Sequence, residues 1–292
     1  MIVPSPLVDK SEVAEHYDGL NQFYHDVWGL HRHHGYWQNG GETPVEAIRL
    51  MAQKILDAAK ASSGGRVVDV GCGPGGVAWF FTENANVEVV GYTISKEEER
   101  TAVGHGARAD GNAPRFIHGD WLDNHLADES ADAVLLIESL SHMADRMAVL
   151  AEIARVLKPG GRLVMADWAA SGKPQRWQVK GLLQPICRGG RLTGLVTPEE
   201  NGKMLEAASL LLLEQADLTG SVSKTWWVIV ARALANVSCW KLLGRCLLSD
   251  WPRFFAIPRV MLAYAVGCLS YQWMVAEKGS CGSSRIEAEV PL

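Results

Sequence analysis

The sequence predicts an α/β protein with a doubly wound, mostly parallel sheet. Short runs rich in β-branched residues alternate with stretches of helical length from residue 66 to residue 168. Strands that alternate with helices indicate a parallel sheet covered on both faces. The first strand also runs directly into a glycine-rich turn that opens a helix. We expect strands at residues 67–70, 87–91, 115–118, 133–137 and 162–166.

Length and composition fit one core with an additional helical part. The 292 residues can bury a full α/β core but fall short of two average-sized domains. A net charge of -5, with 48% hydrophobic and 21% charged residues, suggests neither disorder nor a nucleic-acid partner. The six cysteines include no C-x-x-C pair, and residues 1–15 contain no long apolar run. We therefore expect reduced thiols, no signal peptide and a cytoplasmic protein.

Helical patterns flank the predicted strands. Apolar residues recur with helical spacing at residues 46–56, and again at 148–157 before a Lys-Pro-Gly-Gly stop. Six of the eleven tryptophans follow Trp168. The seventeen uncharged residues 260–276 are at the lower limit for a membrane span, and we expect a buried or interfacial helix there. At most a peripheral membrane contact is expected.

The glycine-rich turn carries the clearest chemical signal. Residues 67–76 read VVDVGCGPGG, and glycines are needed where a ligand approaches the backbone more closely than a Cβ permits. Gly71, Gly73 and Gly76 also have the G-x-G-x-x-G spacing of dinucleotide sites. Such sites usually have an acidic residue at the end of the second strand, whereas this strand ends in the sequence GYTIS at 91–95. The turn therefore favours a different nucleoside.

Residues 66–168 resemble the core of class I S-adenosylmethionine-dependent methyltransferases. The resemblance rests on Asp69 before the glycine turn and on Gly119-Asp120-Trp121 after the third strand. It is closest to the γ-tocopherol methyltransferase group, through Tyr17-Asp18 and the sequences WGLHRHHGYW at 28–37 and ESLSHM at 138–143. That group includes plant alkaloid N-methyltransferases and is loosely related to cyclopropane-fatty-acid synthases and prenyl-diphosphate C-methyltransferases.

The resemblance implies S-adenosylmethionine as the cofactor and a role for individual residues. Glycine-turn residues would line the methionine end, the end of the second strand would surround the ribose, and Asp120 would accept a hydrogen bond from the adenine amino group. Glu98 stands where related sequences often have glutamine. The residues implied to bind the cofactor are Tyr17, Asp69, Gly71, Gly73, Thr93, Ile94, Ser95, Asp120 and Trp121.

The same patterns divide the chain into four parts. Residues 1–60 are expected to form an N-terminal helical lid, and residues 61–170 the cofactor-binding α/β core. Residues 171–278 would form a helical region that covers the acceptor and contains the remaining core strands. Residues 279–292 look like a flexible tail.

Two residues are candidates for catalysis. Glu138 ends the fourth strand, at the sheet edge where ligands collect, and its carboxylate could balance the sulfonium charge or accept a proton. His142 follows four residues later and is the second candidate base. The histidine tract at 31–34 has no partner with metal-ligand spacing elsewhere, so no metal is expected. The candidates for binding the acceptor are Tyr36, Trp37, Trp177 and Arg188.

We predict a methyltransferase that acts on oxygen, nitrogen or activated carbon of a small, largely apolar molecule in secondary metabolism. Methyl transfer from a sulfonium mainly needs alignment, and a base is required for a phenol but not for a neutral amine. One alternative is C-methylation of a prenyl diphosphate, possibly with cyclisation, in which Arg188, Arg191 or Arg253 and Mg²⁺ would bind the diphosphate. Another is a non-catalytic cofactor-binding protein, against which the intact glycine turn argues.

Overall fold

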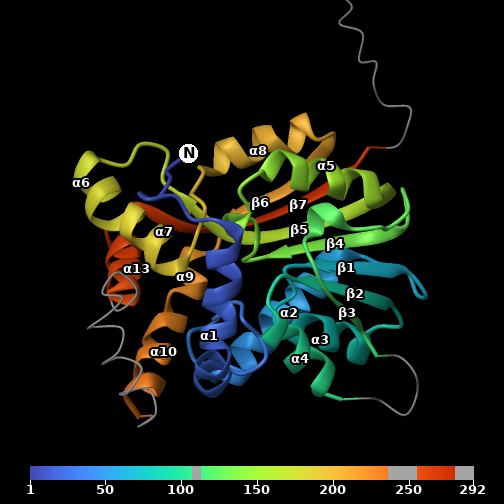
Figure 1. Cartoon of the computed structure of the whole chain (residues 1–292), viewed down its shortest axis with the longest axis horizontal. Coiled ribbons are helices and arrows are strands. Elements are labelled where there is room, and N and C mark those ends of the chain that lie inside the picture. The colour runs from blue at the N-terminus through green and yellow to red at the C-terminus, as the bar shows by residue number, and fades with distance from the viewer. Residues whose placement is uncertain (107–112, 236–254, 280–292) are drawn as a thin grey trace, which may run out of the picture.

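Seven strands form one sheet in the order β3-β2-β1-β4-β5-β7-β6 (Figure 1). The computed structural model describes residues 1–106, 113–235 and 255–279. The pairs among the first five strands are parallel, and β7 runs antiparallel to both β5 and β6. The doubly wound, mostly parallel sheet is confirmed. The strands are β1 (Arg66–Val70), β2 (Glu88–Thr93), β3 (Arg115–His118), β4 (Ala131–Ile137), β5 (Leu157–Ala170), β6 (Leu210–Asp217) and β7 (Leu269–Lys278).

Helices cover both faces of this sheet. Successive residues of β1 point to opposite faces, so Val67 packs in one apolar cluster and Val68 in the other. The Val67 cluster includes residues of α2 (Pro44–Ala59) and α3 (Gly76–Asn84). The Val68 cluster includes residues of α5 (Arg146–Val156) and α8 (Pro198–Ala207). This two-sided burial explains why the strands are continuous apolar runs.

Side-chain caps fix where the N-terminal helices begin. Asp9 and Glu12 form a capping box at the start of α1 (Lys10–Trp28), and Thr43 and Glu46 form another at the start of α2. Helix α1 then packs on α4 (Lys96–Gly104), where Asn21 Nδ2 donates to Thr101 Oγ1 over 2.8 Å. These contacts hold α1 across the carboxyl ends of the parallel strands.

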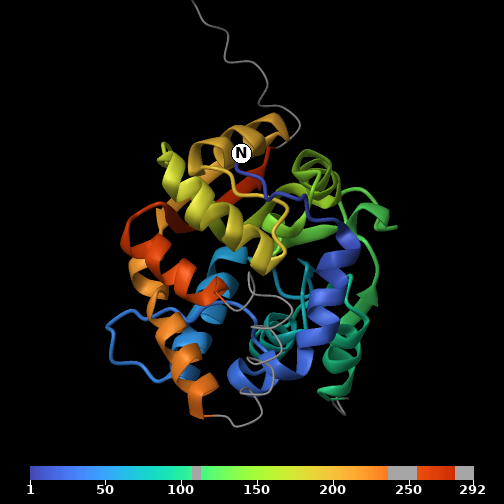
Figure 2. The ribbon, with the colours of Figure 1, turned by 60° about the vertical axis from the view of Figure 1, so that its left-hand side comes forward.

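The remaining helices lie at the same end of the sheet. Figure 2 shows α1, α7, α10 and α13 around the centre of the molecule. Their inner faces are apolar, as in the cluster that joins Ile186 of α7 to Val260 of α13. The elements are η1 (Trp121–Asp123), η2 (Leu140–His142), α6 (Arg176–Gln178), η3 (Val179–Leu183), α7 (Gln184–Gly190), α9 (Thr219–Val222), α10 (Lys224–Ala235) and α13 (Ala256–Ala265).

The expectation of one helix over residues 260–276 is wrong. Helix α13 ends at Ala265, Gly267 takes a left-handed conformation with φ of 65°, and β7 begins at Leu269. Because β7 is buried between two strands, its apolar run has no polar alternation that would distinguish it from a helix. Among the described residues, no helix combines the length and apolarity needed to cross a bilayer.

Strand β5 is longer than the sequence predicts. It extends from Leu157 to Ala170 and therefore includes Pro159, Gly160 and Gly161, which the sequence suggests as a helix stop. A register shift between Ala131 and Ala133 of β4 accommodates the added residues. The predicted tail at 280–292 and Arg253 lie outside the described residues.

Candidate cofactor and acceptor site

A cavity of about 480 Å³ lies at the carboxyl ends of the parallel strands. The sheet order changes direction between β1 and β4, and open α/β sheets bind ligands at such a switch point. Each of the first five strands contributes to the wall at its carboxyl end. These strand-end residues are Gly71, Gly73, Thr93, Ile94, Gly119, Asp120, Trp121, Glu138, Ser139, Asp167 and Trp168.

Helices form the rest of the wall, and their contribution is mainly apolar. Residues from α1, α7, α10 and α13 take part, among them Val13, Leu20, Val27, Ile186, Trp226, Ile229, Ile257 and Val260. Charged groups are fewer and mostly acidic. Those in the wall are Lys10, Arg32, Glu98, Asp120, Glu138, Asp145 and Asp167.

Two glycines of the turn line the cavity, and each is required for a different structural reason. A Cβ on Gly71 would lie 2.4 Å from the Ser139 Cβ, so Gly71 is required by packing within the protein. A Cβ on Gly73 would meet nothing closer than Arg32 Cγ at 3.4 Å and Glu98 Oε1 at 3.5 Å. Both glycines have positive φ. Only Gly73 therefore leaves room for close approach of a ligand.

Buried acids lie on either side of this turn. Asp69 is 2% exposed, its carboxylate forms no hydrogen bond to any described residue, and burial raises its pKa to about 7. Burial also raises the pKa of Glu98 to about 7, although Arg32 and the Thr93 hydroxyl oppose the rise. Two nitrogens of Arg32, Nε and Nη1, have no hydrogen-bond partner. The neighbourhood of the turn thus combines one uncompensated carboxylate, Asp69, with the unsatisfied guanidinium donors of Arg32, which complements a zwitterion.

Asp120 lies at the other end of the strand-end wall and is engaged by α1. Its Oδ2 lies 2.7 Å from Lys10 Nζ, and its Oδ1 accepts a hydrogen bond from the Leu122 N–H over 3.0 Å. Burial tends to raise the pKa of Asp120, but these two contacts outweigh it, and the pKa is lowered. The carboxylate is therefore ionised and able to accept hydrogen bonds.

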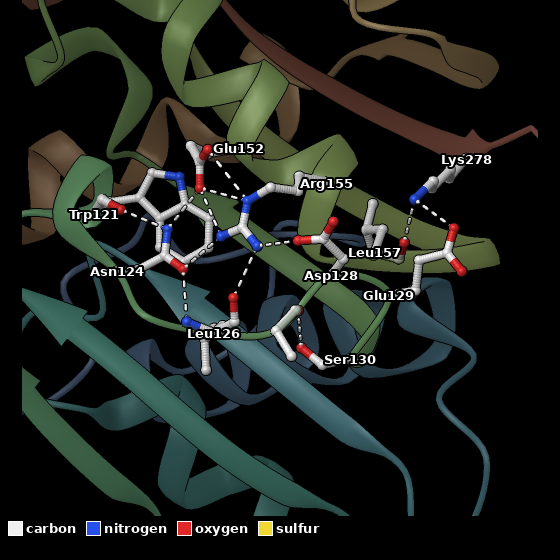
Figure 3. A network of polar contacts seen from close by, with 11 residues as sticks. Trp121, Asn124, Leu126, Asp128, Glu129, Ser130, Glu152, Arg155, Leu157 and Lys278 are labelled. Atoms are coloured by element: carbon white, nitrogen blue, oxygen red, sulfur yellow. Dashed lines mark hydrogen bonds and ion pairs between the residues drawn. The ribbon is translucent and has the colours of Figure 1, made fainter.

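A polar network stabilises the loop that carries Trp121 (Figure 3). Arg155 binds the carboxylates of Asp128 and Glu152, over 2.6 and 2.8 Å, and Asn124 Oδ1 over 3.2 Å. Asn124 Nδ2 in turn donates to the Trp121 carbonyl oxygen over 2.8 Å. The network holds Trp121 at the cavity wall, while Arg155 and its partners lie outside the cavity.

Glu138 is held ionised by residues distant in sequence. Its Oε1 accepts hydrogen bonds from the His34 N–H (2.6 Å), His34 Nδ1 (2.8 Å) and the Tyr271 hydroxyl (2.8 Å). Burial alone would raise the pKa of Glu138, but the charge and hydrogen bonds of His34 outweigh it and lower the pKa. Glu138 also has a positive φ of 54°, a costly conformation for a non-glycine residue that is enriched at functional sites. A carboxylate in this state is a weak base and a good partner for a positive charge.

His142 is presented as a neutral imidazole. Its Nδ1 lies 2.9 Å from the Arg191 carbonyl oxygen, which can only accept a hydrogen bond, so Nδ1 carries the proton. Nε2 is then an acceptor and receives a hydrogen bond from the Tyr17 hydroxyl over 2.9 Å. Burial lowers the pKa of His142. The lone pair of a base therefore lies at the cavity wall.

Most residues that the sequence assigns to the cofactor and to catalysis line the cavity. Asp69 and Ser95 do not: Asp69 is covered within β1, and the Ser95 hydroxyl donates to Asp18 Oδ1 over 2.6 Å. The predicted residues that line the cavity are Tyr17, Gly71, Gly73, Thr93, Ile94, Asp120, Trp121, Glu138 and His142.

None of the four residues that the sequence assigns to acceptor binding lines the described cavity. Trp37 is buried against α2, and its Nε1 donates to Thr225 Oγ1 over 3.1 Å. Tyr36 faces a separate hollow beside Lys54. Trp177 is 53% exposed, and Arg188 is bound to Glu12 over 2.6 Å. Aromatic character alone did not show which tryptophans face inward.

Several cavity residues were not assigned from the sequence. Trp168 and Trp226 form an aromatic cluster with His34, with ring centroids 5.2 to 6.0 Å apart. Asp167 accepts hydrogen bonds from the Ser141 and Trp168 N–H groups, and burial raises its pKa to about 6. Asp167 directly follows the strand that the sequence predicts at 162–166, so its position was a signal present in the sequence. Among the described residues, no cluster of side chains could hold a metal ion.

Comparison with known proteins agrees with this geometry. A family model described as a methyltransferase domain matches residues 68–165. The chain is 30% identical to the methyltransferase GfsG of Streptomyces halstedii over 218 residues, which cover 73% of this chain and 78% of that protein. It is 27% identical to a probable chloroplastic tocopherol O-methyltransferase of Oryza sativa subsp. japonica over 287 residues, covering 92% of this chain and 78% of the relative.

A solved structure supports the fold. The cyclopropane synthase MmaA2 from Mycobacterium tuberculosis superposes with a TM-score of 0.79 at 16% identity, covering 94% of this chain and 100% of that chain. An identity this low shows a shared fold and nothing of the reaction. Together with the sequence relatives, it confirms the resemblance drawn from the glycine turn. The chain belongs to the class I S-adenosylmethionine-dependent methyltransferases.

Proposed function

We propose that this methyltransferase acts on a hydroxyl group of a small, largely apolar acceptor, with His142 as the general base. The observation that carries the proposal is the pair of contacts made by His142, which fix a proton on Nδ1 and leave Nε2 as an acceptor. A phenol or alcohol must lose a proton as its oxygen is methylated, and a neutral imidazole suits that task. The relationship to a tocopherol O-methyltransferase supports oxygen as the methylated atom.

The residues at the glycine turn fit the methionine end of the cofactor. S-adenosylmethionine supplies an electrophilic methyl group on a sulfonium. Asp69 does not line the cavity, so its buried carboxylate would attract the ammonium group of the cofactor through charge, whereas the unsatisfied donors of Arg32, which lines the cavity, would bind the cofactor carboxylate. Glu98 lies beside Gly73 and would accept hydrogen bonds from the ribose, and Asp120 would accept one from the adenine amino group. Lys10 would first have to leave Asp120.

Glu138 suits a role in charge compensation. Its Oε1 is saturated by His34 and Tyr271, and its pKa is lowered, so it would hold negative charge near the sulfonium and take no proton. This differs from the expectation drawn from the sequence, in which Glu138 is the first candidate base. His142 would accept the acceptor proton at Nε2 after the acceptor hydroxyl replaces that of Tyr17. A carbon–oxygen bond would form as the methyl–sulfur bond breaks.

The composition of the wall argues against a diphosphate acceptor. Lys10 and Arg32 are the cations that line the described part of the cavity, and Lys10 lies beside Asp120 at the end proposed for adenine. Arg188 is bound to Glu12 and Arg191 does not line the cavity. The helical half of the wall offers apolar and aromatic side chains instead. We therefore infer an uncharged, largely apolar acceptor.

Two further expectations belong to the proposal. The described cysteines Cys72, Cys187 and Cys268 are free thiols, which supports a reducing compartment such as the cytoplasm. Helix α1 forms part of the cavity wall through Val13, Tyr17 and Leu20, which supports the proposal that the N-terminal region is a lid over the bound ligands.

The test is a product assay with cofactor labelled in the transferred methyl group. A panel would contain apolar phenols, each with its amine and methyl-ether counterpart, and prenyl diphosphates with and without Mg²⁺. Products are identified by mass spectrometry. Methylation of phenols that disappears in His142→Ala, with cofactor binding retained, would support the proposal. Methylation confined to amines or to prenyl diphosphates would refute it.

A further inference from the structure

The helical segment before α7 has a basic, tryptophan-bearing outer face. Lys173, Arg176, Trp177 and Lys180 are all exposed, and Trp177 is 53% accessible. In the described part of the chain, the three cations form neither an ion pair nor a hydrogen bond with a side chain. The opposite side of the same helical stretch is buried, through Leu182 and Leu183. The exposed side is therefore available to a partner outside the molecule.

The positive charge of this face is unusual for the chain. Lys173, Arg176 and Lys180 belong to a segment without any acid between Asp167 and Glu199, whereas the whole chain has a net charge of -5. A locally cationic surface on an acidic protein attracts anionic partners selectively. The charge is therefore a feature of this face and not of the protein as a whole.

Helix α13 extends the face with apolar residues. Its inner side packs on η3 and α7 through Val260 and Ala263. Leu262 of this helix is 48% accessible, and Val266, which directly follows the helix, is 38% accessible. Figure 1 shows α6 and α13 at the same edge of the molecule, and Figure 2 brings that edge forward. We call the surface formed by Lys173, Arg176, Trp177, Lys180, Leu262 and Val266 the basic-apolar edge.

We propose that the basic-apolar edge docks on an anionic lipid surface. Interfacial helices bind membranes through a tryptophan and aliphatic side chains that enter the headgroup region, with lysine and arginine paired to anionic lipids. The edge offers these groups together: one exposed tryptophan, two exposed aliphatic residues and three available cations. An acidic protein or a nucleic acid would use the cations but gain little from Leu262 and Val266.

The basic-apolar edge lies close to the cavity, so docking could help an acceptor reach the site. The helices that carry the edge also line the cavity, α7 through Ile186 and α13 through Ile257 and Val260. An apolar acceptor dissolves mainly in lipid, so docking would place the cavity next to the membrane that contains the acceptor. This last step rests on the proposed apolar acceptor, whereas lipid binding itself does not.

The experiment measures vesicle binding by the full chain without acceptor. Co-sedimentation is compared for vesicles of phosphatidylcholine and for vesicles that also contain phosphatidylglycerol. We expect binding to the anionic vesicles and a loss of roughly 100-fold in the partition coefficient for K173Q/R176Q/K180Q, because each cation near an anionic surface contributes roughly fivefold. Trp177→Ala should also weaken binding, by roughly tenfold. Each variant should keep the wild-type melting temperature and affinity for S-adenosylhomocysteine.

Matched controls separate this face from general charge effects. R49Q/K60Q/K96Q removes three exposed cations elsewhere, and Leu211→Ala removes a side chain that is 64% exposed on β6. Both controls should bind anionic vesicles within about twofold of wild type, since neither alters the edge. Absence of vesicle binding, equal binding to both lipid compositions, or equal loss in the control triple would overturn docking by this edge. Those results would leave the proposed O-methylation untouched, because it is assayed in solution.

Discussion

The hydroxyl oxygen of Tyr17 on α1 lies 2.9 Å from Nε2 of His142, which follows β4. The two side chains also meet edge to face, with ring centroids 5.4 Å apart. The proposed base is therefore covered by the helix that forms part of the proposed lid. An acceptor hydroxyl that displaces Tyr17 would take up the same hydrogen bond to Nε2.

Removal of the proposed base should slow turnover and spare binding. We expect His142→Ala to lower kcat by roughly 10²- to 10⁴-fold, the usual contribution of general base catalysis. Affinity for S-adenosylhomocysteine, measured by calorimetry, should change little, because His142 contacts Tyr17 and Arg191 and not the glycine turn. His125→Ala, at an exposed position, serves as the control. A wild-type kcat in His142→Ala would exclude it as the base.

The pH dependence follows from the direction of the His142 pKa. The base acts in its neutral form, so activity falls when the imidazole is protonated. Burial lowers the pKa of His142 below the ordinary value of 6.5. We therefore expect kcat to reach half its maximum at a pH below 6.5. An acid limb centred above pH 6.5 would contradict this assignment.

Neutralisation of Glu138 should act on the charged cofactor more than on its product. Glu138→Gln keeps an oxygen for the His34 and Tyr271 donors but removes the negative charge. We expect affinity for S-adenosylmethionine to fall by on the order of tenfold relative to S-adenosylhomocysteine, because only the former carries the sulfonium charge. Calorimetry with both ligands measures the difference. Equal weakening of both ligands would indicate a packing role.

The two turn glycines should differ in what they affect. Gly71→Ala should destabilise the protein by about 2 kcal/mol or more, because its Cβ would lie 2.4 Å from the Ser139 Cβ at a positive φ. Gly73→Ala meets no clash within the protein and carries only the strain of its positive φ, so it should destabilise the protein less than Gly71→Ala and should reduce cofactor affinity. Thermal unfolding and calorimetry on both variants test the contrast. The reverse pattern would place the methionine end of the cofactor elsewhere.

The uncompensated carboxylate of Asp69 should cost stability at high pH. Burial raises its pKa to about 7 from an ordinary value of 3.8, so the folded state binds the proton more tightly than the unfolded state. The resulting penalty is small at pH 4 and grows as pH rises to about 7. We expect Asp69→Asn to raise the melting temperature at pH 8 by roughly 4 °C or more, with a smaller gain at pH 5. The same variant should bind the cofactor more weakly. An equal gain at both pH values would show that Asp69 is compensated.

Lys10 and Asp120 should have opposite effects on cofactor binding. Asp120→Ala removes the proposed acceptor for adenine and should weaken both the cofactor and its product by about 1.5 to 3 kcal/mol. Lys10→Ala removes the partner 2.7 Å away that competes for the carboxylate, and should strengthen binding by up to about fivefold. Titration calorimetry of both variants with the cofactor measures the two effects, and each variant serves as the control for the other because the expected changes have opposite signs. Weaker binding in Lys10→Ala would mean that Lys10 itself contacts the ligand.

Local sequence patterns were sufficient to predict the strands of the core and the residues at their carboxyl ends. Each predicted strand of the parallel sheet lies within an observed one or overlaps it. For the central strands the reason is that a strand buried on both faces must be a continuous apolar run. Gly73, Asp120 and Glu138 lie within three residues of the ends of β1, β3 and β4, so parallel pairing brings them to one edge, and His142 reaches the same edge through η2. The same reasoning did not predict β7, because the apolar residues of that segment fit a helix equally well.

The sequence by itself determined the α/β core, the glycine turn and the acids and histidine that follow the strands. Only the tertiary structure decided how these groups are tuned and which aromatic residues reach the cavity. The contacts that set the states of His142 and Glu138 come from Tyr17, His34, Arg191 and Tyr271, between 49 and 133 residues away in the chain. Their approach depends on how α1, α7 and β7 pack, and local periodicity carries no record of that packing. The same reason explains why Trp168 and Trp226 line the cavity while Trp177 faces outward.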